Sequence, residues 1–100
     1  MKYKIRLSPK AKKDIQAAIE WYIQNQSGLG DKFYFNLQAN IEKLESNPFY
    51  QIRYDNVRCM PLKKFPYMLH FTIDESRRIV TIRAVFNTSM DPKNWTERET

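Results

Sequence analysis

In residues 3–7, apolar side chains alternate with the charged side chains of Lys4 and Arg6. A period of two is typical of a strand with one buried face. Ser8 and Pro9 then indicate the start of a helix, because a serine side chain can accept a backbone N–H at the N-cap and proline fits the first helical position. We therefore expect a strand that is followed directly by a helix.

Two stretches of helical periodicity follow. The apolar face of the first consists of Ala11, Ile15, Ala18, Ile19 and Tyr22, and Gly28 is a candidate C-cap for this helix. Asp31 is a candidate N-cap for the second, which is expected to end before Pro48. The apolar face of the second consists of Phe33, Leu37, Ile41 and Leu44. Because few residues separate the two helices, we expect an antiparallel helical hairpin.

From Ile52 onward the hydrophobic period changes to two, and residues 57–64, 68–73 and 79–86 are predicted strands. In the last of these, one face is expected to hold Val80, Ile82, Ala84 and Phe86. The simplest connection of consecutive strands is an antiparallel meander, packed on one face by the helical hairpin. The predicted fold class is therefore α+β, in the order strand, helical hairpin, strand meander.

The composition restricts the class of protein. With 100 residues, of which 42% are hydrophobic and 14% aromatic, the chain is expected to form a single domain over residues 1–100. Cys59 is the only cysteine, which excludes an internal disulfide and a multi-cysteine metal site and favours a reducing compartment. The sequence shows no signal peptide and no apolar run of membrane-spanning length. We therefore expect a cytoplasmic protein without a membrane partner.

The net charge of +6 favours an acidic or polyanionic partner. The positive charge is concentrated in two blocks. Residues 1–26 contain six basic and two acidic side chains, and residues 51–70 contain four and one. Residues 71–100 are balanced, with five of each sign. The excess of positive charge therefore lies in residues 1–26 and 51–70.

The C-terminal half carries the most specific pattern. Residues 58–71 read R-x-x-x-L-x-x-F-P-Y-x-L-x-F, and residues 91–95 read D-P-x-x-W. Together with the run S-P-K-A-K-K-D-I at residues 8–15, this pattern resembles the RelE/ParE superfamily of toxins from bacterial type II toxin–antitoxin modules. It is closest to the ParE-like branch, which includes plasmid stabilisation toxins. The resemblance covers nearly the whole chain and implies the α+β fold predicted above.

The resemblance also implies a function. Members of this superfamily are small basic toxins that a cognate antitoxin neutralises, here expected in a toxin–antitoxin hetero-oligomer. Two activities recur among them. One branch cleaves messenger RNA in the ribosomal A site, and the other poisons DNA gyrase and is not known as an enzyme. Neither a cofactor nor a metal ion is expected, so the choice depends on individual residues.

Two positions favour binding over catalysis. Many relatives carry histidine where this chain has Asn87 and arginine where it has Met90. An asparagine cannot exchange a proton near neutral pH, and a methionine offers no charge to a phosphate. We therefore expect a ParE-like toxin that binds a macromolecular target such as DNA gyrase. The alternatives are a RelE-like ribosome-dependent mRNA endoribonuclease and an attenuated toxin that retains antitoxin binding.

The residues expected to contact the target or the antitoxin lie in the C-terminal half: Arg58, Lys63, Lys64, Arg83, Asn87, Met90, Asp91 and Trp95. If the chain is an enzyme, the candidates for catalysis are Lys63, Arg58, Arg83 and Asn87. The three cations among these would then hold phosphate. Arg83 is expected to point away from the core, because its neighbours in the strand are predicted to point inward.

Three further residues are expected to have structural roles. His70, the only histidine, is predicted to be a partly exposed residue on the outward face of its strand rather than a catalytic group. Trp21 is predicted to pack in the core beside Tyr22, and the alternative is that it faces an antitoxin helix. Cys59 is predicted to be a small buried apolar residue.

Overall fold

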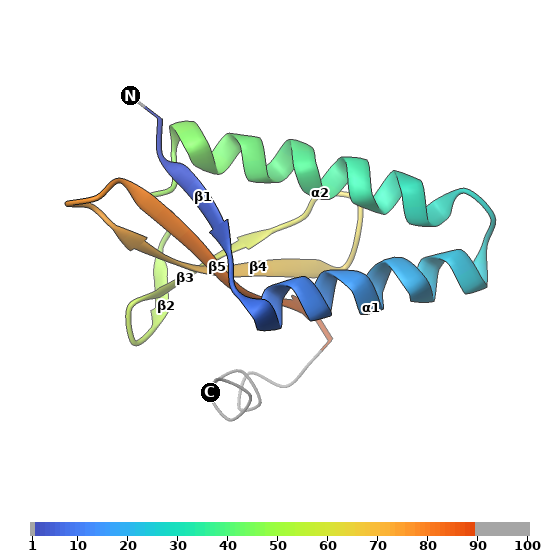
Figure 1. The fold of residues 1–100 in the computed structure, drawn as a ribbon. Helices are drawn as coiled ribbons and strands as arrows, with labels where there is room; N and C mark the ends of the chain where they lie inside the picture. The colour runs from blue at the N-terminus through green and yellow to red at the C-terminus, as the bar shows by residue number, and fades with distance from the viewer. Residues whose placement is uncertain (1, 90–100) are drawn as a thin grey trace.

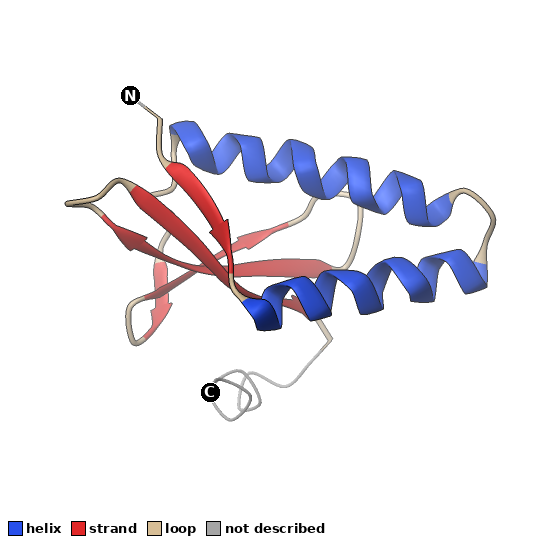
Figure 2. Ribbon diagram, viewed as in Figure 1, coloured by secondary structure: helices blue, strands red, loops and turns tan. Residues whose placement is uncertain are grey.

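The computed structural model describes residues 2–89. The elements along the chain are β1 (Lys4–Leu7), α1 (Pro9–Asn25), α2 (Leu29–Ser46), β2 (Ile52–Tyr54), β3 (Val57–Pro61), β4 (Tyr67–Asp74) and β5 (Ile79–Asn87). The two helices lie side by side on one face of the sheet (Figure 1). Helices and strands therefore form two layers (Figure 2). The predicted α+β fold class is confirmed.

The strands form one five-stranded sheet in the order β1-β5-β4-β3-β2. Consecutive strands from β2 to β5 pair antiparallel, so the predicted meander is confirmed. β1 adds to this meander as a parallel neighbour of β5, with Arg6 beside Thr81. β3 ends at Pro61, earlier than predicted, because the N–H of Leu62 donates to the carbonyl of Tyr67 at 2.9 Å and closes the connection to β4.

The helix starts and ends follow local chemistry. The Ser8 side-chain oxygen accepts the N–H of Ala11 at 3.1 Å, which confirms the predicted N-cap of α1. The predicted roles of Gly28 and Asp31 were wrong: α1 ends at a cap on Gln26, and Gly28 is the N-cap of α2. Gly28 has φ 83°, a left-handed conformation that glycine adopts without a Cβ penalty. Asp31 lies in the first turn of α2, where the helix dipole favours a carboxylate.

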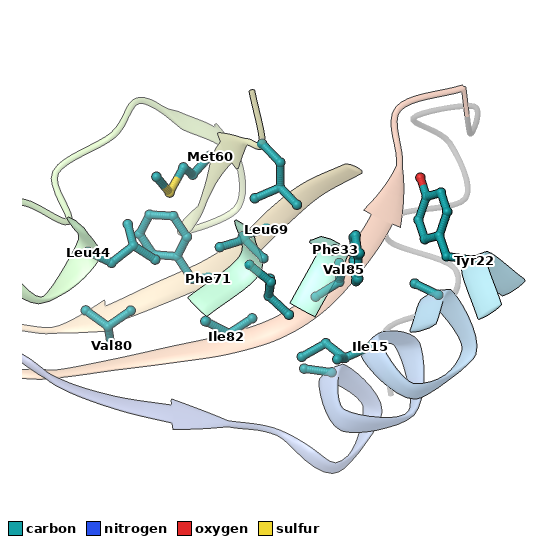
Figure 3. Close-up of a cluster of buried hydrophobic side chains, with 14 residues drawn as sticks. Ile15, Tyr22, Phe33, Leu44, Met60, Leu69, Phe71, Val80, Ile82 and Val85 are labelled. Carbon is teal, nitrogen blue, oxygen red and sulfur yellow. The ribbon is translucent and has the colours of Figure 1, made fainter. Parts of the chain in front are cut away.

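The main core lies between the helices and the sheet (Figure 3). Its largest fully buried apolar side chains are Phe33, Leu37 and Leu44 from α2 and Leu69, Phe71, Val80 and Ile82 from the sheet. Burying one such side chain contributes about 1.5–3 kcal/mol. The amphipathic stripes predicted for the two helices therefore hold them on the sheet.

Trp21 lies outside this core. Its side chain is 54% exposed, whereas the neighbouring Tyr22 is 6% exposed. The predicted core position of Trp21 was therefore wrong. Consecutive residues on a helix point about 100° apart, so only Tyr22 falls on the buried stripe.

β5 contains a bulge at Arg83. Across the pair with β4, Phe71 stands opposite Ile82 and His70 stands opposite Ala84, so Arg83 is an extra residue in β5. A bulge places two residues against one on the partner strand and changes the alternation of faces beyond it. The two halves of β5 therefore present different sets of side chains to the core.

This bulge overturns the predicted common face of β5. Up to Ile82 the even-numbered residues face the main core, but beyond the bulge Val85 takes the core position. Ala84 and Phe86 instead form a second, smaller cluster with Cys59. We call the sheet face opposite the helices the outer face, and this cluster lies on it.

Candidate functional surface

Lys63 and Lys64 lie exposed in the connection between β3 and β4. The N–H of Thr88 donates to the carbonyl of Pro66 at 2.8 Å, and this bond holds the connection against the end of β5. Residues 62–66 and 87–89 therefore share one end of the sheet. We call this region the loop-end surface.

Four aromatic rings support the loop-end surface from the helix side. Phe65 lies 5.1 Å from Tyr22 and 5.2 Å from Phe33 between ring centroids, and Tyr67 lies 5.3 Å from Phe33. Such contacts contribute about 0.5–1.5 kcal/mol each beyond burial. Burial and the neighbouring Tyr67 raise the pKa of Tyr22, so its phenol stays neutral. The Phe-Pro-Tyr segment thus packs against the helices and positions the two lysines.

Asn87 is the last residue of β5 and stands opposite Tyr67. Its side-chain oxygen accepts the N–H of Ser89 at 2.9 Å and the hydroxyl of Ser89 at 2.6 Å. Asparagine commonly stabilises a turn by bonding to the backbone two residues on. Asn87 therefore directs the chain as it leaves the sheet, and it presents amide donors but no group that exchanges a proton near neutral pH.

Only part of the predicted contact set gathers at this end of the sheet. The loop-end surface brings together Lys63, Lys64 and Asn87, whose roles in binding stay a prediction. The predicted contacts Met90, Asp91 and Trp95 lie outside the described residues. The remaining two, both arginines, lie elsewhere.

Arg58 lies on the helix side of the sheet, opposite Phe71 of β4. Its Nη1 donates to the carbonyl of Tyr50 at 2.7 Å, and its guanidinium lies 5.4 Å from the ring centroid of Phe49. A hydrogen bond from a charged donor contributes about 1.5–3 kcal/mol. Arg58 therefore tethers the segment between α2 and β2 to the sheet, at a distance from the loop-end surface.

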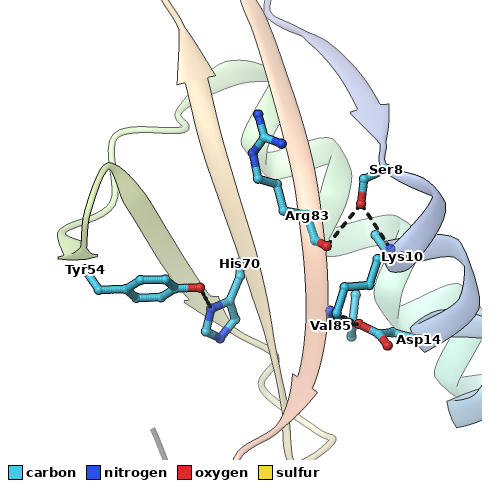
Figure 4. Close-up of polar contacts among 8 residues, drawn as sticks. Ser8, Lys10, Asp14, Tyr54, His70, Arg83 and Val85 are labelled. Carbon is cyan, nitrogen blue, oxygen red and sulfur yellow. Dashed lines mark hydrogen bonds and ion pairs between the residues drawn. The ribbon is translucent and has the colours of Figure 1, made fainter. Parts of the chain in front are cut away.

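Arg83 projects from the outer face of the sheet, as predicted, and is exposed. Its Nε donates to Oγ1 of Thr72 at 3.0 Å. Its backbone carbonyl accepts the hydroxyl of Ser8 at 3.0 Å on the other side of the strand (Figure 4). Arg83 and Arg58 therefore lie on opposite faces of the sheet and do not form one site.

The predicted partial exposure of His70 was wrong. His70 does lie on the outer face, but its side chain is 0% exposed. The hydroxyl of Tyr54, from β2, lies 3.0 Å from Nδ1 of His70 (Figure 4), and the ring of Phe86 lies 4.8 Å away between centroids. β2 was not predicted as a separate strand, and it is this strand that brings Tyr54 over the histidine.

The surroundings of His70 disfavour its protonation. Its pKa is lowered to about 4, chiefly by burial and further by the cations Arg53 and Lys10, with Asp14 acting in the opposite direction. A group that exchanges protons during catalysis is most effective with a pKa near the working pH. With a pKa of about 4, the imidazole of His70 is uncharged at neutral pH and is poorly matched to this task.

Cys59 is buried, as predicted. Its sulfur lies 3.6 Å from Nδ1 of His70. Burial raises the pKa of the Cys59 thiol to about 11, against a smaller lowering effect of Arg53. Thiolate is the nucleophilic form of cysteine, so the Cys59–His70 pair is neutral and serves as packing. Residues 2–89 contain no group of three or more His, Cys, Asp or Glu side chains that could hold a metal ion.

Sequence reasoning missed the polar contacts that join α1 to β5. Asp14 accepts the N–H of Val85 at 3.1 Å and forms an ion pair with Lys10 at 3.0 Å (Figure 4). Asp14 therefore accepts a backbone N–H at the edge of β5, past the point where β1 ends. No signal in the sequence distinguishes Asp14 from the solvent-facing charges of α1, because its role depends on where β5 lies.

Solved structures with a similar fold include chains from toxin–antitoxin systems. A chain of the chromosomal ParDE system from P. aeruginosa has a TM-score of 0.71 at 16% identity, covering 85% of this chain and 95% of that one. A chain of the intact E. coli RelBE toxin–antitoxin complex has a TM-score of 0.65 at 15% identity, covering 85% of this chain and 95% of that one. A chain of the RelE–RelB complex from Pyrococcus horikoshii OT3 has a TM-score of 0.57 at 12% identity, covering 91% of this chain and 100% of that one. At these identities the likeness concerns the fold.

Sequence comparison identifies the family. Residues 5–92 match the family model described as the ParE toxin of the type II toxin–antitoxin system parDE. No curated protein sequence matches the chain. The chain belongs to the ParE toxin family of type II toxin–antitoxin systems. In the part that the structure describes, neither helix is long and apolar enough to cross a membrane.

Proposed function

We propose that this ParE-family toxin inhibits a macromolecular target by binding it, that DNA gyrase is this target, and that a cognate antitoxin neutralises the toxin in the cytoplasm. The family match supports the toxin assignment. The choice of binding over RNA cleavage rests on the arrangement of ionisable side chains. The loop-end surface presents two lysines and an asparagine, a set suited to contacts with an acidic surface.

The single observation that carries the proposal is the enclosure of His70. It is the only histidine of the chain, and it is fully buried with its pKa lowered to about 4. Metal-independent RNA cleavage needs a base for the 2′-hydroxyl and an acid for the leaving oxygen. Histidine is the side chain most often used for both tasks, and here it cannot reach a substrate without unfolding of β2.

The antitoxin is proposed on two grounds. Structures with this fold include toxin–antitoxin complexes, such as the E. coli RelBE complex. The chain itself carries a net charge of +6, which attracts an acidic partner over long range. We therefore propose a hetero-oligomer in which the antitoxin covers the basic loop-end surface.

Purified toxin, tested in parallel against DNA gyrase and against translating ribosomes, separates the possible activities. We expect inhibited supercoiling and intact messenger RNA. Codon-linked cleavage of the messenger would instead identify a ribosome-dependent endoribonuclease and would overturn the proposal. Silence in both assays, with no growth arrest on expression, would identify an attenuated toxin.

A pair of substitutions tests whether Asn87 and Met90 are the reason why the toxin does not cleave RNA. Asn87→His and Met90→Arg together restore the residue types found in many relatives. If the proposal holds, the double variant gains no messenger cleavage, whereas a gain would show that these two positions had limited catalysis. Addition of the purified antitoxin should abolish the inhibition of supercoiling by both proteins.

A further inference from the structure

A shallow polar basin of about 480 Å³ lies on the outer face, at the end of the sheet where β4 turns into β5. Arg6 of β1 stands beside Thr81 of β5, and Thr81 stands opposite Thr72 of β4. Arg83 follows on β5 and lines the same basin. Two arginines and two threonines from three adjacent strands therefore converge on one surface.

The guanidinium of Arg83 is held in place. Its Nε donates to Oγ1 of Thr72 at 3.0 Å, and Thr72 is itself 9% exposed. A guanidinium has five N–H donors in a rigid fork, so this bond leaves the Nη groups available. Arg83 follows the inward residue Ile82 and therefore points outward, and the bulge then turns Ala84 outward as well.

Neither Arg6 nor Arg83 forms an ion pair with any of residues 2–89. The ion pair at the rim of the basin in this part of the chain joins Arg77 to Asp74 at 3.9 Å. Asp74 also accepts the hydroxyl of Ser76 at 2.8 Å, and this bond, with the backbone N–H of Arg77, lowers the pKa of Asp74. Asp74 is thus bonded within its own turn. With Glu75 it lines the basin as a second carboxylate, so the lining holds the three arginines Arg6, Arg77 and Arg83 against two carboxylates and keeps an excess of positive charge.

We infer that this basin binds the phosphodiester backbone of a nucleic acid. Arginine forks and threonine hydroxyls are typical phosphate contacts. An acidic protein segment would fit less well, because protein interfaces are built around an apolar centre, whereas only Ile73 and Ile79 among the lining residues are apolar. Nucleic-acid interfaces are more polar and more positively charged.

The basin is separate from the loop-end surface. β4 runs from Tyr67 at the loop end to Asp74 at the far side of the basin, a strand of eight residues, which is about 25 Å at the usual rise per residue. Arg83, the basin residue nearest to the loop end on β5, precedes Asn87 by four residues, which is about 13 Å. The inference therefore does not depend on the proposed target. A toxin without effect on gyrase is still expected to bind nucleic acid through Arg6 and Arg83.

Binding of a short duplex DNA of random sequence, measured by fluorescence anisotropy over a range of salt concentrations, tests the site. Arg6→Gln and Arg83→Gln are each expected to weaken binding on the order of 3- to 10-fold at low salt and to reduce the slope of log affinity against log salt by about 1. Lys32→Gln, an exposed residue at the start of α2, removes the same charge on the helical layer. It is expected to leave the slope unchanged.

Arg83→Lys separates charge from geometry. It keeps the cation but loses the fork, so we expect an intermediate affinity. Arg6 makes no side-chain bond within residues 2–89, so Arg6→Gln is expected to keep the melting temperature of the wild type. Inorganic phosphate should shift the amide resonances of Thr72 and Thr81. The inference is overturned if Arg6→Gln, Arg83→Gln and Lys32→Gln behave alike, or if a polyglutamate peptide occupies the basin and DNA does not.

Discussion

The hydroxyl of Tyr54 lies 3.0 Å from Nδ1 of His70, across a sequence separation of 16 residues. This contact joins the short strand β2 to the middle of β4 on the outer face. Because β2 brings Tyr54 over the second apolar cluster, a histidine at an outward strand position is completely enclosed. The position of the edge strand β2 therefore contributes to the burial that lowers the pKa of His70.

The enclosure of His70 predicts acid-sensitive stability. The pKa of His70 is about 4 in the folded chain, against about 6.5 in an unfolded one. Between these two values only the unfolded chain takes up the proton, so this contribution is complete above pH ~6.5 and is lost as the pH falls towards 4. We expect a loss of up to about 3 kcal/mol in the free energy of unfolding, measured by urea titration.

His70→Phe provides the control for this pH dependence. It removes the titrating group and keeps an aromatic ring in the cluster. The slope of stability against pH should flatten in this variant between pH ~4 and ~6.5. An unchanged slope would show that other groups cause the acid sensitivity.

Tyr54→Phe tests the hydrogen bond itself. Removing the hydroxyl takes away one partner of a buried imidazole, which should cost about 0.5–1.5 kcal/mol of unfolding free energy. The matched control is Tyr34→Phe, because Tyr34 is 41% exposed and accepts a hydrogen bond from Gln38 on the helix surface. Equal effects of the two substitutions would argue against a special role of the Tyr54 hydroxyl.

Arg58 is predicted to contribute to the stability of the fold rather than to contact with the target. Arg58→Leu removes the bond to the Tyr50 carbonyl and should lower the unfolding free energy by about 1.5–3 kcal/mol. Lys63→Gln, at an exposed loop position, should stay within about 0.5 kcal/mol of the wild type. Thermal and urea unfolding measure both. If Arg58→Leu is as stable as Lys63→Gln while losing target inhibition, Arg58 is a contact residue rather than a tether.

Gly30 is predicted to couple to Ile23 across the helical hairpin. A Cβ at position 30 would lie 2.6 Å from Cγ1 of Ile23 and 3.3 Å from the carbonyl oxygen of Ile19. Gly30→Ala should therefore destabilise the wild type, although alanine is favoured over glycine in a helix by about 1 kcal/mol. In an Ile23→Ala background the closest clash is gone, and Gly30→Ala should be less destabilising or even stabilising. A double-mutant cycle without coupling would contradict this packing.

The order of elements could be predicted from the sequence because it depends on local patterns. The Ser8 cap, the two amphipathic stripes and the alternation in the strands each act over a few residues. The bulge at Arg83 could not be predicted, since nothing in the run from Ile79 to Asn87 marks an extra residue. Its effect was to exchange the faces of Ala84 and Phe86.

The candidate site was predicted only in part, for a related reason. Lys63, Lys64 and Asn87 lie at one end of the sheet, and their proximity follows from the meander. The outward face of Arg83 followed from the alternation in its strand. Arg58 was chosen by sequence similarity, and its place on the helix side of the sheet depends on strand register. The buried state of His70 depends on β2, which is too short for its periodicity to be recognised.

Inhibition of gyrase supercoiling by loop-end variants is the most direct test of a binding toxin. Lys63→Gln combined with Lys64→Gln should raise the toxin concentration needed for half-inhibition, while messenger RNA on translating ribosomes stays intact. Lys12→Gln with Lys13→Gln, two exposed positions on α1, removes the same charge and should inhibit as the wild type does. Equal inhibition by both double variants would contradict a target-binding role of the loop-end surface, and messenger cleavage by the wild type would contradict a binding mechanism altogether.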